Sequence, residues 1–374
     1  MNLIKKSILF GTALLFSSFS AIAEIKVVTT IKPVHSLVSG VMDGVSNPTL
    51  IIEGSNSPHN FSLKPSHAKM LEEADIVFWI GEDLESFMEK PLNSLAKNAV
   101  QISFMDLKSI KKLKFREMND HDDHDDHHGH EDEHEGHDDH DNDGHKDDDH
   151  DDHGHDDHHG HEDEHEGHDD HDNDGHKDDD HDDHGHDDHH GHEDEDDDPS
   201  HDGHNHGEFD AHIWLDPVNA KVMISEIAHE LSELDPSNKS NYEKNAEKMI
   251  SSFDDLIDRV STIVPNNPSF IVFHDAYQYF ENRFNIKSAG ALTLNPEVLP
   301  GAKQIAEIQE LIEHDNVKCI FSEPQYNPKI IEMLSADMKV STSVLDPLGA
   351  DINAGPKMYN NLILQIANSL KDCS

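Results

Sequence analysis

Histidine is the residue type in this sequence with the clearest capacity for metal chemistry. Three histidines fall at predicted strand ends or in loops: His59 follows a short apolar run, His212 precedes a predicted helix start, and His274 directly follows the run Phe270 to Phe273. Ligands of α/β proteins bind at the carboxyl ends of parallel strands, and three imidazoles plus a carboxylate or water suffice for tetrahedral zinc. The sequence therefore predicts a metal site formed by these histidines, although polar residues also occupy strand ends without binding any ligand.

Four other histidines outside the acidic tract favour structural roles. His67 lies at a predicted helix start, His229 and His314 lie in glutamate-rich helical stretches, and His35 completes the group. A zinc hydrolase is not expected, because Glu233 stands where an HExxH motif beginning at His229 requires its second histidine. The sequence also contains no Gly-rich phosphate loop and no serine nucleophile elbow. These observations favour a binding protein over an enzyme.

A tract rich in histidine and acidic residues interrupts the chain at residues 119–208. The segment that begins at His127 recurs at His158 and His189, a spacing of 31 residues, and it offers no apolar face that a solenoid could bury. The composition predicts a disordered insertion. We expect it to collect metal at weak auxiliary sites, with a solvated acidic loop as the alternative. The candidate auxiliary ligands are His121, His124, His127, His128, His130, His153, His155, His158, His159, His161, His184, His186, His189, His190, His192, His201, His204 and His206.

The formal net charge of −51 is concentrated in this tract. Residues 120–208 contain 43 acidic residues and two lysines, so the rest of the chain carries only −10. No segment concentrates basic residues, which argues against nucleic acid or an anionic membrane as a partner.

The first residues predict export. Lys5 and Lys6 precede the uncharged, mostly apolar stretch Ile8 to Phe19, and Ala21 to Ala23 forms a small-residue cleavage signature. This order is typical of a Sec signal peptide, here residues 1–23. The apolar stretch is shorter than the roughly 20 residues that cross a bilayer. We therefore expect cleavage after Ala23 and a periplasmic protein.

The chain has two cysteines, Cys319 and Cys373, and no CxxC pair. A thiolate zinc site of the finger type is thus excluded. In an oxidising compartment the simplest expectation for two such cysteines is one disulfide, which would join the C-terminal tail to an internal strand.

The body outside the tract alternates short apolar runs with helical segments. Predicted strands such as 25–31, 76–80 and 270–273 alternate with predicted helices such as 65–73 and 302–312. This alternation predicts α/β lobes with mostly parallel sheets. The expected ligand site is the cleft between two such lobes.

A long amphipathic helix is predicted to connect the two lobes. Apolar residues recur at three- and four-residue steps from Tyr242 to Val260, and Ser240 with Glu243 predicts a capping box at its start. The expected organisation is a signal peptide at 1–23, an N-terminal lobe at 24–118, the insertion at 119–208, a return to the first lobe at 209–236, the connecting helix at 237–264 and a C-terminal lobe at 265–374.

Several motifs across the body together resemble the ZnuA family of zinc-uptake solute-binding proteins. They occur in the family's order, and the acidic, histidine-rich insertion lies where ZnuA proteins carry theirs. The motifs are Gly54 to Ser66 (GSNSPHNFSLKPS), Ala211 to Pro217 (AHIWLDP), Val272 to Phe280 (VFHDAYQYF), Asn295 to Glu297, Ser322 to Gln325 and Asp346 to Gly349.

The resemblance implies a periplasmic receptor that captures Zn²⁺ and delivers it to an inner-membrane ABC permease. It implies that His59, His212 and His274 are the ligands, and that Cys319 and Cys373 form a disulfide. It also implies two β/α lobes joined by the long helix. We expect a monomer.

The fourth ligand stays open at this stage. Some ZnuA proteins have an acidic residue directly before the first histidine, whereas this chain has Pro58, which cannot coordinate. Asp346 matches the position where related metal receptors supply a carboxylate, and a water molecule is the other candidate. Related manganese receptors keep two histidines and two carboxylates, so a three-nitrogen set favours zinc. The alternatives are a receptor for manganese, nickel or copper, and a metal-storage or adhesin-like protein.

Overall fold

The first four strands form a parallel sheet. The computed structural model describes residues 24–116 and 207–373, and the strand order of this sheet is β2-β1-β3-β4. β1 is central and pairs in parallel with β2 and with β3. The four strands are β1 (Val27–Thr29), β2 (Thr49–Leu50), β3 (Ile76–Trp79) and β4 (Val100–Ser103).

A second parallel sheet repeats this topology in the C-terminal half of the chain. Its strand order is β6-β5-β7-β8, so its central strand β5 again pairs with the next two strands of the sequence. All five residues of β5 are buried, as expected of an apolar central strand covered on both faces. The four strands are β5 (Phe270–His274), β6 (Gly290–Thr293), β7 (Cys319–Ser322) and β8 (Ser341–Val344).

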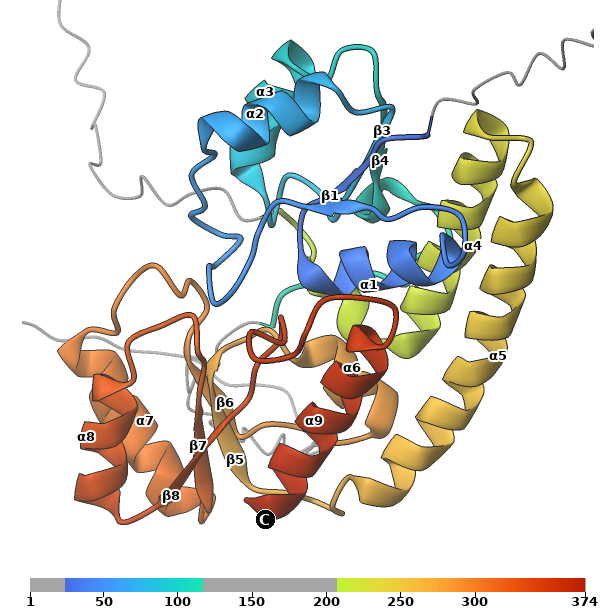
Figure 1. Cartoon of the computed structure of the whole chain (residues 1–374). Coiled ribbons are helices and arrows are strands. Elements are labelled where there is room, and N and C mark those ends of the chain that lie inside the picture. Colours follow the sequence, from blue (N-terminus) through green and yellow to red (C-terminus); the bar gives the residue numbers. More distant parts are fainter. Residues whose placement is uncertain (1–23, 117–206, 374) are drawn as a thin grey trace, which may run out of the picture. The chain divides into compact units, whose positions relative to one another are not determined.

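The helices alternate with the strands (Figure 1). The predicted fold class, two α/β lobes with parallel sheets joined by a long helix, is therefore confirmed. We call the part around β1–β4 the first lobe and the part around β5–β8 the second lobe. The α-helices are α1 (Lys32–Val41), α2 (Pro65–Glu72), α3 (Glu89–Ser94), α4 (Pro217–Leu234), α5 (Lys239–Ile263), α6 (Gln278–Phe284), α7 (Ala302–His314), α8 (Lys329–Met338) and α9 (Met358–Asp372), and the 3-10 helices are η1 (Ser86–Met88), η2 (Phe104–Asp106) and η3 (Ile213–Leu215).

Helix α4 begins where the sequence predicts it. The side chain of Asp216 accepts a hydrogen bond from the backbone amide of Val218 at 2.8 Å, and Pro217 is the first helical residue. A carboxylate cap satisfies an amide that has no partner within the helix. Asp216 also pairs with Arg283 of α6, with both of its oxygens engaged. The N-terminus of α4 is therefore tied to the second lobe.

The predicted capping box of the long helix is wrong. Helix α5 begins at Lys239, so Ser240 lies inside the first turn, and the N-cap residue Asn238 makes no side-chain cap bond. Asp235 binds this end instead, because its carboxylate accepts from Asn238 and from the hydroxyl of Tyr242. These two hydrogen bonds fix the turn between α4 and α5 without a Ser–Glu box.

Helix α5 lies beside α4 and extends from the first lobe to the second (Figure 1). Its buried stripe includes Tyr242, Phe253 and Val260, as the apolar periodicity predicts. The last helix, α9, packs against α5 and α1, and the Tyr359 ring stacks on Phe253 with centroids 4.9 Å apart. The C-terminal helix therefore contributes to the core of both lobes.

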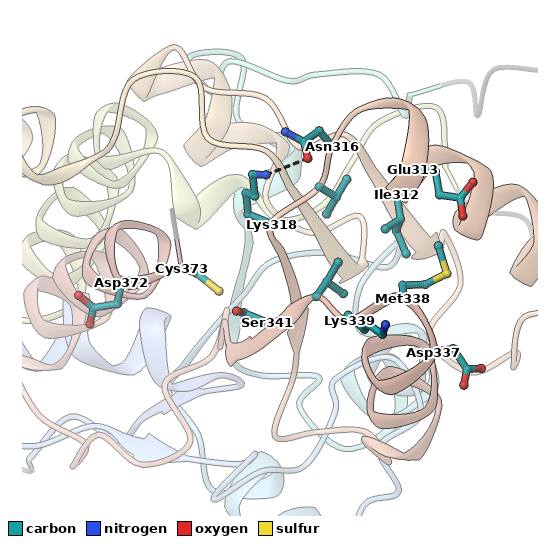
Figure 2. A pocket seen from close by; sticks show the side chains of 12 residues that line it. Ile312, Glu313, Asn316, Lys318, Asp337, Met338, Lys339, Ser341, Asp372 and Cys373 are labelled. Atoms are coloured by element: carbon teal, nitrogen blue, oxygen red, sulfur yellow. Dashed lines mark hydrogen bonds between the residues drawn. The ribbon is translucent and has the colours of Figure 1, made fainter.

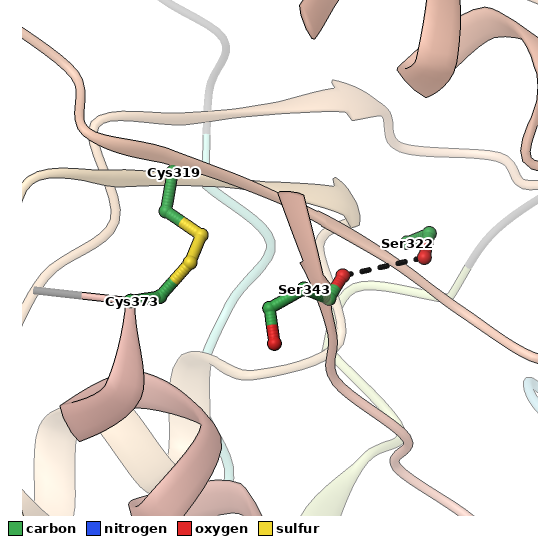
Figure 3. Close-up of a disulfide and its surroundings, with 4 residues drawn as sticks. All are labelled: Cys319, Ser322, Ser343 and Cys373. Carbon is green, nitrogen blue, oxygen red and sulfur yellow. Dashed lines mark hydrogen bonds between the residues drawn. A yellow bond between two sulfur atoms is a disulfide. The ribbon is translucent and has the colours of Figure 1, made fainter. Parts of the chain in front are cut away.

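A disulfide closes the C-terminal segment, as predicted. Cys319, the first residue of β7, bonds Cys373, which directly follows α9 (Figure 3). Their Cα atoms lie 5.7 Å apart, within the usual range for a disulfide. The bond fixes the end of α9 to the buried strand β7.

Some predictions concern residues outside the described ranges. These are the signal peptide at 1–23 and the auxiliary histidines between His121 and His206. Within the residues that are described, no helix is long and apolar enough to cross a membrane.

Candidate metal centre

The loop after β2 carries His59. This half-buried residue follows buried Pro58, and its backbone amide donates to the Ser57 hydroxyl at 3.2 Å. The Ser57 hydroxyl also shares a hydrogen bond of 2.9 Å with that of Tyr326, which lies in the second lobe. The loop that positions His59 is therefore connected directly to the opposite lobe.

His212 lies immediately before the 3-10 helix η3 and is 5% exposed. Its Nδ1 lies 2.7 Å from Oδ1 of Asp210, and the same oxygen accepts from the backbone amide of His212 at 2.9 Å. Asp210 is fully buried, and Gln278 donates to its second oxygen. One carboxylate thus fixes both the main chain and the ring of His212.

His274 is the last residue of β5 and is 3% exposed. Its Nδ1 lies 2.7 Å from Oε1 of Glu323, which follows the neighbouring strand β7. Burial alone would lower the pKa of His274, but the negative charge of Glu323 and its hydrogen bond more than offset this, so the pKa is raised. The imidazole consequently retains a proton to higher pH than an ordinary histidine.

The structure brings the three predicted histidines together. Each of His59, His212 and His274 offers one nitrogen, and these three atoms lie within 4.8 Å of one another. The Nε2 atoms of His212 and His274 are 3.3 Å apart. The adjoining cavity has a volume of about 10 Å³, which is on the order of one small ion or water molecule.

The carboxylates determine which ring nitrogens face this cavity. A carboxylate accepts the Nδ1–H of a neutral imidazole, which leaves the Nε2 lone pair free for a metal. His212 and His274 both have this arrangement, through Asp210 and Glu323. The two Nε2 atoms can therefore donate to the same cation without any rotation of the rings.

Asp346, the predicted carboxylate ligand, is held in a turn of the second lobe. Its Oδ1 accepts from the backbone amide of Leu348 and from Nε2 of Gln325, each at 2.9 Å, and its Oδ2 accepts from the backbone amide of Ala350. Among the described residues, the group that could hold a metal contains the three histidines and not Asp346. Both carboxylate oxygens already bind N–H donors.

The segment that enters the insertion is connected to the metal centre. Arg116, the last described residue before it, forms ion pairs with Asp275 and Glu281, and Asp275 directly follows His274. Where the chain returns, Lys114 and Phe209 form an antiparallel bridge. Both ends of the insertion are thereby fixed within a few residues of a predicted ligand.

The other four histidines lie outside the cluster. His35 in α1 contacts the carbonyl of Pro48, and burial lowers its pKa. His67 accepts from the backbone amide of Lys64 at the start of α2 and stacks on Phe61. His314 is exposed and pairs with its neighbour Asp315, and His229 lies in α4.

A larger pocket lies at the opposite end of the second sheet, where β7 and β8 begin (Figure 2). Its volume is about 820 Å³, and its lining residues include Lys318, Ser341 and Cys373 but no histidine. It lacks the nitrogen ligands that a zinc site requires. The small histidine cavity is therefore the better candidate for metal chemistry.

Sequence reasoning assigned no role to Asp210 and Glu323. Asp210 could have been found from its position two residues before His212, a short separation that suits a side-chain contact. Glu323 follows β7 as His274 ends β5, but the adjacency of these strands is known only from the sheet order.

Comparison with known proteins identifies the family. The family model for the zinc-uptake complex component A, periplasmic (ZnuA), matches residues 27–373. The chain belongs to the ZnuA family. The high-affinity zinc uptake system protein ZnuA of Brucella abortus (strain 2308) is 43% identical over 349 residues, which is 93% of this chain and 91% of the relative.

Two solved structures show that the ZnuA fold extends over the described body. A ZnuA crystal structure has a TM-score of 0.64 at 18% identity and covers 93% of this chain and 98% of its own. A ZnuA deletion mutant with zinc bound has a TM-score of 0.62 at 18% identity, with coverage of 93% and 97%. At this level of identity the likeness concerns the fold.

Proposed function

We propose that this ZnuA-family chain is the periplasmic receptor of a zinc importer, which captures Zn²⁺ and delivers it to an inner-membrane ABC permease. The observation that carries the proposal is the convergence of one nitrogen each from His59, His212 and His274 within 4.8 Å. Zinc is the cargo of the protein, so the site must bind the ion firmly and also release it.

The donor set favours zinc over manganese. Three imidazole nitrogens suit Zn²⁺, whereas Mn²⁺ prefers oxygen-rich sites. Asp210 and Glu323 lie behind two of the rings and add negative charge that compensates the cation. They also fix the ring tautomers, so little ordering is required when the metal arrives.

Water is the proposed fourth ligand. Asp346 lies outside the group of side chains whose ligand atoms converge within 4.8 Å, and three N–H donors hold its carboxylate in the turn, so direct coordination would require this turn to move. A water molecule in the cavity needs no such rearrangement. The carboxylate of Asp346 then stabilises the turn whose backbone amides it binds.

The histidine tract is proposed to be an auxiliary collector. Its histidines, among them His121, His158 and His189, would bind Zn²⁺ more weakly than the preformed cluster, because flexible ligands lose entropy when they converge on one ion. Deletion of residues 119–205 should therefore remove weak sites and retain the tightest one. Loss of the tightest site would contradict this assignment.

We also propose the division of the chain into segments that the sequence predicts. Residues 1–23 would be a signal peptide, 24–118 and 209–236 the first lobe, 237–264 the connecting helix and 265–374 the second lobe. Mass spectrometry of periplasmic protein should show Glu24 at the N-terminus. A chain that retains residues 1–23 would contradict the processing.

Isothermal titration of the full-length exported protein tests the proposed function. Wild type should contain one tight site, and His274→Ala should weaken it at least 100-fold because one of three nitrogens is lost. His314→Ala is the matched control, since this exposed histidine lies outside the cluster. Dialysis against equimolar Zn²⁺ and Mn²⁺ should return zinc, and recovery of manganese would refute the zinc assignment.

A further inference from the structure

We infer that Gln325 is a positioning residue that accepts a hydrogen bond from the water bound to the captured metal. This inference rests on the proposed function and concerns the same site. Gln325 lies in the loop after β7 and lines the small cavity beside His59, His212 and His274.

The orientation of the Gln325 carboxamide is fixed by Asp346. The distance from Nε2 of Gln325 to Oδ1 of Asp346 is 2.9 Å. A carboxylate oxygen accepts hydrogen bonds, so the amide must present its nitrogen to Asp346. The carboxamide oxygen therefore cannot exchange places with the nitrogen without losing this contact.

The carboxamide oxygen of Gln325 lacks a donor among the described residues. Its Oε1 atom is buried, yet the described part of the chain offers it no hydrogen-bond partner. Burying an acceptor without a donor is unfavourable, so such an atom requires an explanation. The hydroxyl of Tyr326, a residue that lines the same cavity, is hydrogen-bonded to Ser57 and not to this oxygen.

A hydrated divalent cation supplies the missing donor. Water bound to a metal is a strong hydrogen-bond donor, because the cation withdraws electron density from its oxygen. The three imidazoles carry no proton on the nitrogens that face the metal, so the donor must come from the fourth ligand. Glu323 also lines the cavity, and its Oε2 is likewise buried without a partner among the described residues, but its Oε1 is engaged by Nδ1 of His274, the ring nitrogen opposite to Nε2.

An acceptor in this position also selects the fourth ligand. Gln325 stabilises a ligand that carries a proton, such as water, and disfavours anions without one, such as chloride or azide. Asp346 therefore acts indirectly, because its hydrogen bond to Nε2 of Gln325 fixes the position of the Gln325 carboxamide oxygen. This role differs from direct coordination by Asp346.

The test compares Gln325→Met with wild type and with Gln304→Met. Methionine has a similar length but offers neither the donor nor the acceptor. Gln304 is the matched control, because its side chain also makes one hydrogen bond, to the Leu292 carbonyl, on α7 away from the cluster. Zinc affinity is measured by chelator competition, and azide affinity is measured from the visible spectrum of the Co²⁺-loaded protein.

Gln325→Met should lower zinc affinity by about 10-fold, as outer-sphere partners of a metal site do, and should raise azide affinity by a similar factor. The control should change neither. If Gln325→Met matches wild type in both measurements, or if azide leaves the Co²⁺ spectrum of Gln325→Met unchanged, the inference is refuted.

Two further variants keep the result decisive. Gln325→Asn retains the amide but shortens the side chain by one methylene. Like Gln325→Met, it should lower zinc affinity and raise azide affinity, so it provides the test if the methionine variant does not fold. His274→Ala separates the inference from the function on which it rests. Wild-type zinc affinity in that variant would refute the metal site itself, whereas loss there with no effect at Gln325 would refute only the role of Gln325.

Discussion

Replacement of Glu85 by glutamine should change the pH dependence of stability. Glu85 follows β3 and is fully buried, and its Oε2 accepts from the backbone amides of Ile80 at 2.8 Å and Gly81 at 3.2 Å. Burial raises the pKa of Glu85 from 4.5 to about 7. The carboxyl therefore keeps its proton across a pH range in which the unfolded chain has already lost it.

The sign and the magnitude follow from this difference. Below pH 4.5 the group is protonated in both states, and its contribution to stability is fully present. As pH rises toward about 7, only the unfolded state releases the proton, which favours unfolding. Each pKa unit corresponds to about 1.4 kcal/mol, so the contribution lost on passing through the folded-state pKa is about 3 kcal/mol.

Glu85→Gln mimics the protonated carboxyl at every pH and should not show this loss. Urea unfolding of the metal-free protein at pH 4.5 and pH 8 gives the free energy of unfolding of each variant. The difference between Glu85→Gln and wild type should shift in favour of the variant by about 3 kcal/mol between these pH values. Other titrating groups cancel, because they are the same in both proteins.

Glu82→Gln provides the control, since Glu82 is an exposed carboxylate in the same loop. It should change the pH dependence by less than about 0.5 kcal/mol, as surface substitutions do. If Glu85→Gln and wild type show parallel stability profiles from pH 4.5 to 8, the assignment of a protonated buried carboxyl is wrong.

Three further predictions concern the second lobe. The disulfide closes a loop of 54 residues. The double variant Cys319→Ser, Cys373→Ser should therefore lower the free energy of unfolding, measured in urea, by up to about 4 kcal/mol. An unchanged free energy of unfolding would contradict this prediction. Arg116→Met leaves two buried carboxylates without their ion-pair partner and should lower the free energy of unfolding by about 3 kcal/mol. Arg259→Met, at an exposed position, should change it little. Zinc affinity should fall as pH drops through the raised pKa of His274, because protonated imidazole cannot bind a metal. Chelator competition between pH 5 and 8 should show that the decline begins above pH 6.5, the ordinary histidine value. A constant affinity over this range would exclude titration of His274.

The ligand cluster was predictable because the three histidines have a local signature. Each one ends a strand, follows one or precedes a helix, and parallel α/β sheets bring such positions to one edge. Asp346 was a candidate ligand only through the family resemblance, because related metal receptors supply a carboxylate at this position, and water was the other candidate. Only the positions of the amides of Leu348 and Ala350 show that its carboxylate accepts hydrogen bonds within its own turn.

Elements with weak patterns were missed. β4 (VQIS) alternates apolar and polar residues, and β6 (GALT) combines two apolar residues with a glycine and a threonine, so neither stands out as a buried run. The capping box at Ser240 failed because Asp235 lies five residues earlier and binds the start of α5 through Asn238 and Tyr242. Competing local hydrogen bonds of this kind depend on the turn between α4 and α5, which the sequence pattern does not specify.

The two sheets have the same strand order, and a carboxyl group follows the third strand of each. In the second sheet Glu323 accepts from the ring of His274 and thereby orients a predicted metal ligand. In the first sheet Glu85 accepts from two backbone amides, and burial keeps it protonated up to about pH 7. The two carboxyl groups therefore have different roles: Glu323 orients the ring of a predicted ligand, whereas Glu85 binds the backbone at the end of β3. Among the described residues, the second lobe combines a proposed ligand at its central strand with the carboxylate that orients it, so changes after β7 should alter metal affinity, whereas changes after β3 should alter stability.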